Sequence, residues 1–174
     1  MPVTGAIKIY HADGAEDLST AMDQSSIEPN DLHYLARLAE AGLDEGTVTR
    51  VLFTDKESGL SLTYAWFKKN FPLPRHRHNS DCLYYIISGS LKLGNSVLLA
   101  GDGFLVPADT VYSYTPGDDG VEVLEFRTAD RFDIRFRSSE KAWEQLIAMA
   151  ANNRADWQKQ DDPPVAKRIK GSGD

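Results

Sequence analysis

The sequence predicts an all-β barrel or sandwich with helical additions at both ends. Between residues 47 and 137, short runs of alternating or β-branched apolar residues are separated by turns rich in Gly, Asp and Pro, about every eight to twelve residues. On either side of this range the apolar residues take helical spacing. We therefore expect an N-terminal extension with a short helix at 1–45, a barrel at 46–137, a C-terminal helix at 138–157 and a mobile tail at 158–174.

The short N-terminal helix is predicted from its ends and its apolar face. Asn30 or Asp31 suits the first position, because their side chains accept hydrogen bonds from free backbone N–H groups. Gly42 suits the end, where a left-handed residue is common. The apolar positions between them are Leu32, Leu35, Ala36 and Leu38.

The barrel strands are predicted from alternation, and the turns between them from Gly, Pro and Asp. The expected strands are 47–53, 60–67, 83–87, 91–93, 97–99, 104–106, 111–114, 121–127 and 132–137. The expected turns include 55–59, 94–96 and 116–120.

A helix is predicted after the last strand, followed by a polar segment. Ser138 or Ser139 suits its first position. The apolar residues that follow are spaced for one helical face that docks on the barrel: Trp143, Leu146, Ile147 and Ala150. The polar, proline-containing composition of 158–174 is typical of a mobile tail.

Composition excludes several classes of protein. The net charge of −7 argues against a nucleic-acid partner, which usually selects a basic face. No apolar run approaches the roughly 20 residues of a membrane-spanning helix, and the first residues lack the pattern of a signal peptide. The single cysteine excludes an internal disulfide. We expect a cytoplasmic protein without a membrane partner.

Two motifs in the predicted barrel contain most of the residues that could bind a metal ion or take part in catalysis. In the first, His76 and His78 are one residue apart, so in a strand both point to one face and can meet one metal ion. Cys82 and Gly89 follow. The second motif begins at Gly101-Asp102, continues with Pro107 and ends at Tyr112.

This pair of motifs resembles that of the cupin superfamily, with two ligand positions changed. The cupin motifs carry Glu where this chain has Cys82, and His where it has Tyr112. The resemblance implies a small single-domain protein with a double-stranded β-helix, the cupin jelly-roll barrel. It also implies that His76, His78, Cys82 and Tyr112 point into the barrel as metal-ligand positions. Cupins of this size commonly pair through their barrel edges, so a homodimer is expected.

The expected cofactor is a divalent metal ion. Two imidazoles with a thiolate suit iron, zinc or copper better than manganese. Glu122 and Glu125 lie on opposite faces of one predicted strand, and whichever faces inward could complete the site; Glu125 is our candidate. The alternatives are a solvent-facing carboxylate, an apolar filler role for Cys82 and a buried histidine pair without metal.

The leading functional hypothesis is a cupin-type enzyme that uses a metal held by the two histidines. Its chemistry would be that of an oxygenase, isomerase or lyase on a small organic substrate, aromatic or carbonyl-bearing. Tyr84, Tyr112 and Tyr114 are the expected catalytic residues, with Tyr64 also lining the pocket and Tyr112 acting as an acid or base. The alternatives are a non-catalytic barrel that binds a small ligand, and a metal-independent enzyme that works through His and Tyr acid–base pairs.

Overall fold

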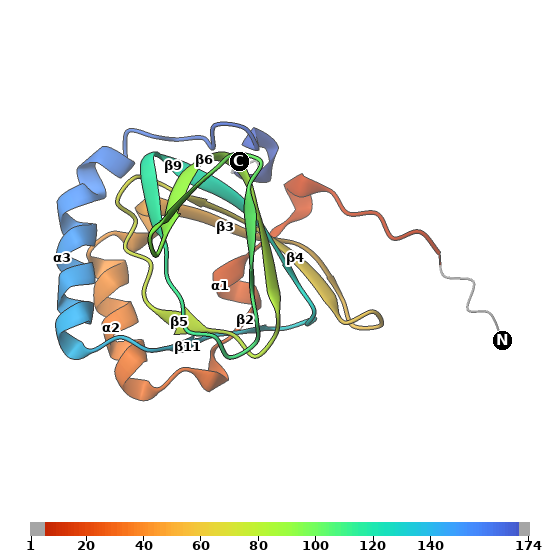
Figure 1. The fold of residues 1–174 in the computed structure, drawn as a ribbon, viewed down its shortest axis with the longest axis horizontal. Coiled ribbons are helices and arrows are strands. Elements are labelled where there is room, and N and C mark those ends of the chain that lie inside the picture. The colour runs from red at the N-terminus through yellow and green to blue at the C-terminus, as the bar shows by residue number, and fades with distance from the viewer. Residues whose placement is uncertain (1–5, 171–174) are drawn as a thin grey trace.

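A curved antiparallel sheet forms most of the protein, as the computed structural model of residues 6–170 shows (Figure 1). The sheet runs in the order β1-β3-β4-β9-β6-β7, and β8 pairs with β6. Its strands are β1 (Glu16–Asp17), β3 (Thr47–Asp55), β4 (Leu60–Phe67), β6 (Cys82–Leu93), β7 (Ser96–Leu99), β8 (Gly103–Val106) and β9 (Thr115–Arg127). Two short pairs complete the barrel: β2 (Met22–Asp23) with β10 (Phe132–Asp133), and β5 (His76–Arg77) with β11 (Arg135–Phe136). The all-β prediction is confirmed.

Alternation along the strands decides which side chains enter the barrel. On β6, Cys82, Tyr84 and Ile86 are buried, whereas Leu83 and Tyr85 are each about half exposed. The interior cluster combines these buried residues with those of β4 and β9 that face the same way. The predicted strand faces of the first motif are therefore confirmed.

Both predicted helices form against one side of the barrel (Figure 1). α2 (Pro29–Glu40) ends before Gly42, which has the expected left-handed conformation. The expected start at Asn30 or Asp31 is wrong, because the helix begins one residue earlier, at Pro29, whose ring suits the first helical turn. α3 (Glu140–Trp157) begins after Ser139, whose side chain accepts a hydrogen bond from the backbone N–H of Ala142. The two helices pack against each other through a stacked pair of rings, Tyr34 of α2 and Trp143 of α3, whose centroids lie 5.5 Å apart. The rest of the extension adds α1 (Leu18–Ala21) and three short 3-10 turns, η1 (Ala12–Gly14), η2 (Gln24–Ser26) and η3 (Leu43–Gly46).

The segment after α3 packs against the outside of the barrel, where a mobile tail was expected. It ends in the 3-10 turn η4 (Lys167–Lys170). Ile169 is buried in a cluster with Leu52, Tyr64 and Trp66 of the outer sheet face. The prediction overlooked this segment because its few apolar residues are scattered among charged ones. The last four residues of the predicted tail lie outside the described part of the chain.

The paired strands β6 and β9 leave no room for a side chain at Gly89. Gly89 has a φ of 72°, and a Cβ atom there would lie 2.1 Å from the carbonyl oxygen of Gly120. Gly120 also has a positive φ, inside the segment 116–120 that was expected to be a turn. That expectation is wrong, because the segment belongs to β9, where irregular pairing with β6 absorbs the extra residues. The strand expected at 111–114 reduces to one bridge between Tyr112 and His76.

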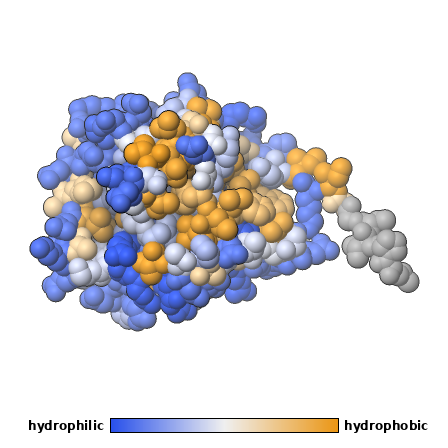
Figure 2. Space-filling model, in the orientation of Figure 1, coloured by the Kyte–Doolittle hydropathy of each residue, from blue (hydrophilic) through white to orange (hydrophobic). Residues whose placement is uncertain are grey.

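Apolar side chains gather on the outer face of the barrel. Leu83 lies opposite both Leu105 and Phe126 in the strand registers, and all three are exposed. Figure 2 shows apolar residues on the barrel face turned to the viewer and a mostly hydrophilic margin. The predicted homodimer stays a prediction. Within residues 6–170, no helix has both the length and the apolar character needed to cross a membrane.

Candidate functional site

The barrel holds a cavity of about 160 Å³ with a mainly apolar wall. The barrel contributes Ala65, Phe67 and Phe71, and the N-terminal extension contributes Leu18, Leu35 and Leu43. The polar and charged side chains of the wall are Thr47, Thr49, Thr63, His76, His78, Tyr84, Tyr114, Glu125 and Arg127. A cavity of roughly 150 Å³ is enough to hold benzene. The arrangement therefore suits a small ligand with an apolar body and a polar group.

Backbone carbonyls hold both histidines in the wall of the cavity. His76 Nδ1 donates a hydrogen bond to the carbonyl of Pro74 at 2.8 Å, and His78 Nδ1 contacts the carbonyl of Asp133. Burial lowers the pKa of His76 to about 4, with a further contribution from His78. Burial and the charge of Arg127 lower the pKa of His78 to about 3. Both imidazoles are therefore neutral at pH 7, and because His76 Nδ1 carries the proton, Nε2 carries the lone pair.

Glu125 faces into the barrel and anchors a chain of hydrogen bonds. Its Oε1 accepts a hydrogen bond of 2.6 Å from the hydroxyl of Tyr84. The hydroxyl of Tyr84 in turn contacts that of Tyr112. Burial, followed by the charge of Glu125, raises the pKa of both tyrosines, so both hydroxyls stay protonated.

Arg127 places a permanent positive charge among these groups. Its side chain is 1% exposed and forms an ion pair with Glu125. Its terminal nitrogens lie 3.3 and 3.4 Å from Nδ1 and Nε2 of His78, and its guanidinium lies over the ring of Phe132. Although burial disfavours its charge, Glu125 raises the pKa of Arg127.

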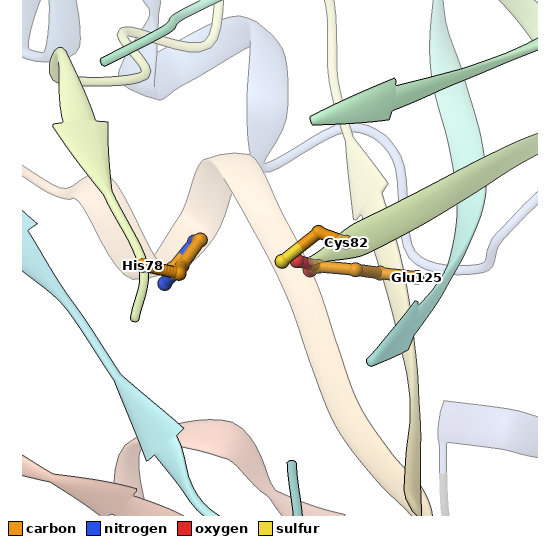
Figure 3. Close-up of side chains that lie close together, drawn as sticks. All are labelled: His78, Cys82 and Glu125. Carbon is orange, nitrogen blue, oxygen red and sulfur yellow. The ribbon is translucent and has the colours of Figure 1, made fainter. Parts of the chain in front are cut away.

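Three candidate metal ligands converge beside this ion pair (Figure 3). One ligand atom each from His78, Cys82 and Glu125 lies within 4.8 Å of the others. Burial raises the pKa of the Cys82 thiol to about 12, so without a metal ion it is protonated at pH 7. His76 packs against His78, with ring centroids 4.9 Å apart.

The structure brings most of the predicted site residues together. His76, His78, Tyr84, Tyr114 and Glu125 line the cavity, whereas Cys82 and Tyr112 are buried behind its wall. Whether any of them ligates a metal or acts in catalysis stays a prediction.

One expectation and one alternative about side-chain direction are wrong. Tyr64 belongs to the outer sheet face, because it alternates with the inward residues Thr63 and Ala65. The solvent-facing alternative fails for both carboxylates, since Glu122 and Glu125 are 0% and 7% exposed. Glu122 lies on the outer face and accepts hydrogen bonds from Tyr64, Ser88 and the backbone N–H groups of Val165 and Ala166.

Sequence reasoning missed Arg127, although a signal was present. Residues two apart on a strand share a face. An inward Glu125 therefore brings Arg127 into the barrel as well, and a buried carboxylate needs a positive partner.

The fold and the two motifs together define a cupin-type β-barrel. The first motif occupies β5 and the start of β6, and the second returns so that Tyr112 bridges His76. No protein-family model and no curated protein sequence matches the chain.

Solved structures similar to this chain include several cupin-type proteins. The polyketide cyclase RemF of Streptomyces resistomycificus is 22% identical, with a TM-score of 0.47 over 62% of this chain and 82% of that one. KdgF of Halomonas is 17% identical, with a TM-score of 0.41 over 47% and 79%. A cupin of Shewanella frigidimarina described as RmlC-like is 23% identical, with a TM-score of 0.41 over 48% and 76%.

Proposed function

We propose that the cavity is the active site of a small-molecule enzyme that moves protons without a metal ion. The observation that carries this proposal is the hydrogen-bonded chain from Glu125 through Tyr84 to Tyr112, which lies beside a neutral histidine in a mainly apolar cavity. Perturbed titratable groups that converge in a cleft are typical of catalytic sites. The reaction class is isomerisation or elimination next to a carbonyl group.

His76 is the base in this scheme. Its Nδ1–H is held by Pro74, which directs proton transfer to Nε2. The imidazole accepts a proton from the carbon beside the substrate carbonyl, and negative charge develops on the carbonyl oxygen. Burial, His78 and Arg127 make His76 a weak base, whereas Glu125 favours the imidazolium that forms. Arg127 stabilises the oxyanion. Return of the proton to a different carbon completes an isomerisation, whereas departure of a leaving group from the neighbouring carbon completes an elimination.

Exchange of hydrogen for deuterium tests the proposal without a known substrate. Butanone and cyclohexanone are incubated with the protein in D₂O, and loss of the α-proton signal is followed by NMR. We expect exchange about a hundredfold above buffer. It should be lost in His76→Gln and kept in the control His33→Gln, which changes an exposed histidine of α2. Equal rates in the wild type and His76→Gln would refute the role of His76.

A metal-dependent enzyme is the second candidate, favoured by the convergence of His78, Cys82 and Glu125. These nitrogen, sulfur and oxygen donors suit zinc, iron or copper better than manganese. In the arrangement described, however, they do not fit an ion, because the Arg127 guanidinium contacts both His78 and Glu125. A metal would have to displace this cation, so no catalytic step is assigned to one.

A further inference from the structure

The charges around the cavity are matched within the wall itself. Among the lining residues within 6–170, the only carboxylate is that of Glu125 and the only Lys or Arg is Arg127. The two form an ion pair. The histidines are neutral, and the remaining lining residues are uncharged. A ligand that enters therefore meets a site of zero net charge.

One hydrogen-bond donor of this wall has no acceptor. Nη2 of Arg127 donates to Glu125, whereas the buried Nε has no hydrogen-bond partner. Buried N–H groups in folded proteins are almost always paired. This Nε is itself buried, so the oxygen of a ligand is held instead by groups that line the cavity, such as the hydroxyls of Thr49 and Thr63.

We propose that the cavity takes a neutral molecule with a benzene-sized apolar body and one carbonyl oxygen, and that it rejects the corresponding carboxylate. The inference rests on the proposed function, because it takes the same cavity as the ligand site. A neutral carbonyl leaves the Glu125–Arg127 pair matched. A carboxylate adds a second negative charge to a buried site with one cation, and burial of an unmatched charge is costly.

Benzamide and benzoate test this selectivity, because they have nearly the same shape and differ in charge. Binding to the wild-type protein is measured by NMR chemical-shift titration at pH 7.5. We expect benzamide to bind at least about tenfold more tightly than benzoate. Equal binding, tighter binding of benzoate, or binding of neither probe would overturn the proposal.

Glu125→Gln provides the sharper test, because it removes the negative charge and leaves Arg127 unmatched. The preference should then reverse in favour of benzoate. The matched control is Glu122→Gln, which makes the same change on the outer face of the same strand and should keep the preference for benzamide. A Glu125→Gln protein that folds and still prefers benzamide would also overturn the proposal. If that variant fails to fold, the wild-type titration still decides.

The two proposals can fail separately. Benzamide binding without deuterium exchange in the ketones would leave the ligand class in place and remove the enzymatic role, as in a non-catalytic binding barrel. Deuterium exchange lost in His76→Gln, combined with tighter binding of benzoate, would keep the enzyme and overturn the ligand class.

Discussion

Glu122 and Glu125 lie three residues apart on β9, and their carboxylates are buried on opposite faces of the strand. Each accepts a hydrogen bond from a buried tyrosine, Glu122 from Tyr64 and Glu125 from Tyr84. The outer pair anchors the C-terminal segment, whereas the inner pair lines the cavity. β9 thus carries a Tyr–Glu pair on each face, one structural and one in the candidate active site. A substitution in the structural pair can therefore serve as the control for the same substitution in the other.

The two tyrosines should separate stability from activity. Tyr64→Phe and Tyr84→Phe each remove a hydrogen bond to a buried carboxylate, and each should lower the free energy of unfolding by about 1–3 kcal/mol in urea titrations. Only Tyr84→Phe should slow deuterium exchange in the ketones. An equal loss of exchange in Tyr64→Phe would contradict the assignment of the two faces.

Metal content should distinguish the two candidate functions. We expect protein purified without added metal or chelator to hold well under one ion per chain by elemental analysis, because Arg127 occupies the contacts of His78 and Glu125. Arg127→Ala should bind zinc more tightly than the wild type in chelator competition. About one ion per wild-type chain, lost in the His76→Ala/His78→Ala double variant, would instead favour the metal-dependent enzyme.

Stability should fall in mild acid because of the two cavity histidines. Their folded pKa values, about 4 and about 3, lie below the ordinary value of 6.5, so the unfolded chain binds more protons between these limits. The stability is complete above pH 6.5 and is lost as the pH falls. Between pH 6.5 and 5 we expect a loss of about 1.5 kcal/mol per histidine. His76→Gln should reduce the pH slope in urea unfolding by about one proton. An unchanged slope would show that His76 is readily protonated in the folded protein.

The C-terminal segment should detach when its apolar contact is removed. Ile169 is 8% exposed, whereas Val165 in the same segment is 60% exposed. Ile169→Ala should accelerate tryptic cleavage at Lys167 and Arg168, because release of the segment exposes its backbone. Val165→Ala is the control and should be cleaved at the wild-type rate. Identical cleavage of the two variants would mean that Ile169 does not hold the segment.

Two glycines with similar backbone angles should tolerate alanine very differently. Gly59 and Gly89 have φ values of 68° and 72°, but a Cβ atom on Gly59 meets open space, whereas one on Gly89 collides with Gly120. Gly59→Ala should cost about 1 kcal/mol for its left-handed conformation. Gly89→Ala should cost several times more or prevent folding, because the strands must separate. Circular dichroism and urea unfolding measure both effects. Equal costs would contradict the close contact between the backbones of β6 and β9 at Gly89.

Local sequence patterns were enough to predict the barrel strands and the helices, because alternation, caps and turn residues depend on only a few neighbouring positions. Alternation along β6 correctly placed Cys82 and Tyr84 inside. The same reasoning did not extend to contacts between distant segments. The partnership of Glu122 with residues 165–166, and the approach of Arg127 to His78, depend on how separate strands and the chain's end meet. The predicted direction of Tyr64 is wrong because both faces of β4 are buried, and an aromatic residue suits either buried face of a sheet.

Part of the apolar wall of the cavity comes from the N-terminal extension, which contributes Leu18, Leu35 and Leu43. The two motifs that resemble those of cupins lie elsewhere, on the strands and the loops between them. Under the proposed ligand assignment, changes confined to the extension would reshape part of the apolar wall and leave Glu125 and Arg127 in place. On the same assignment, exchanging the extension should change the preference for ligand shape without changing the groups proposed to carry the reaction.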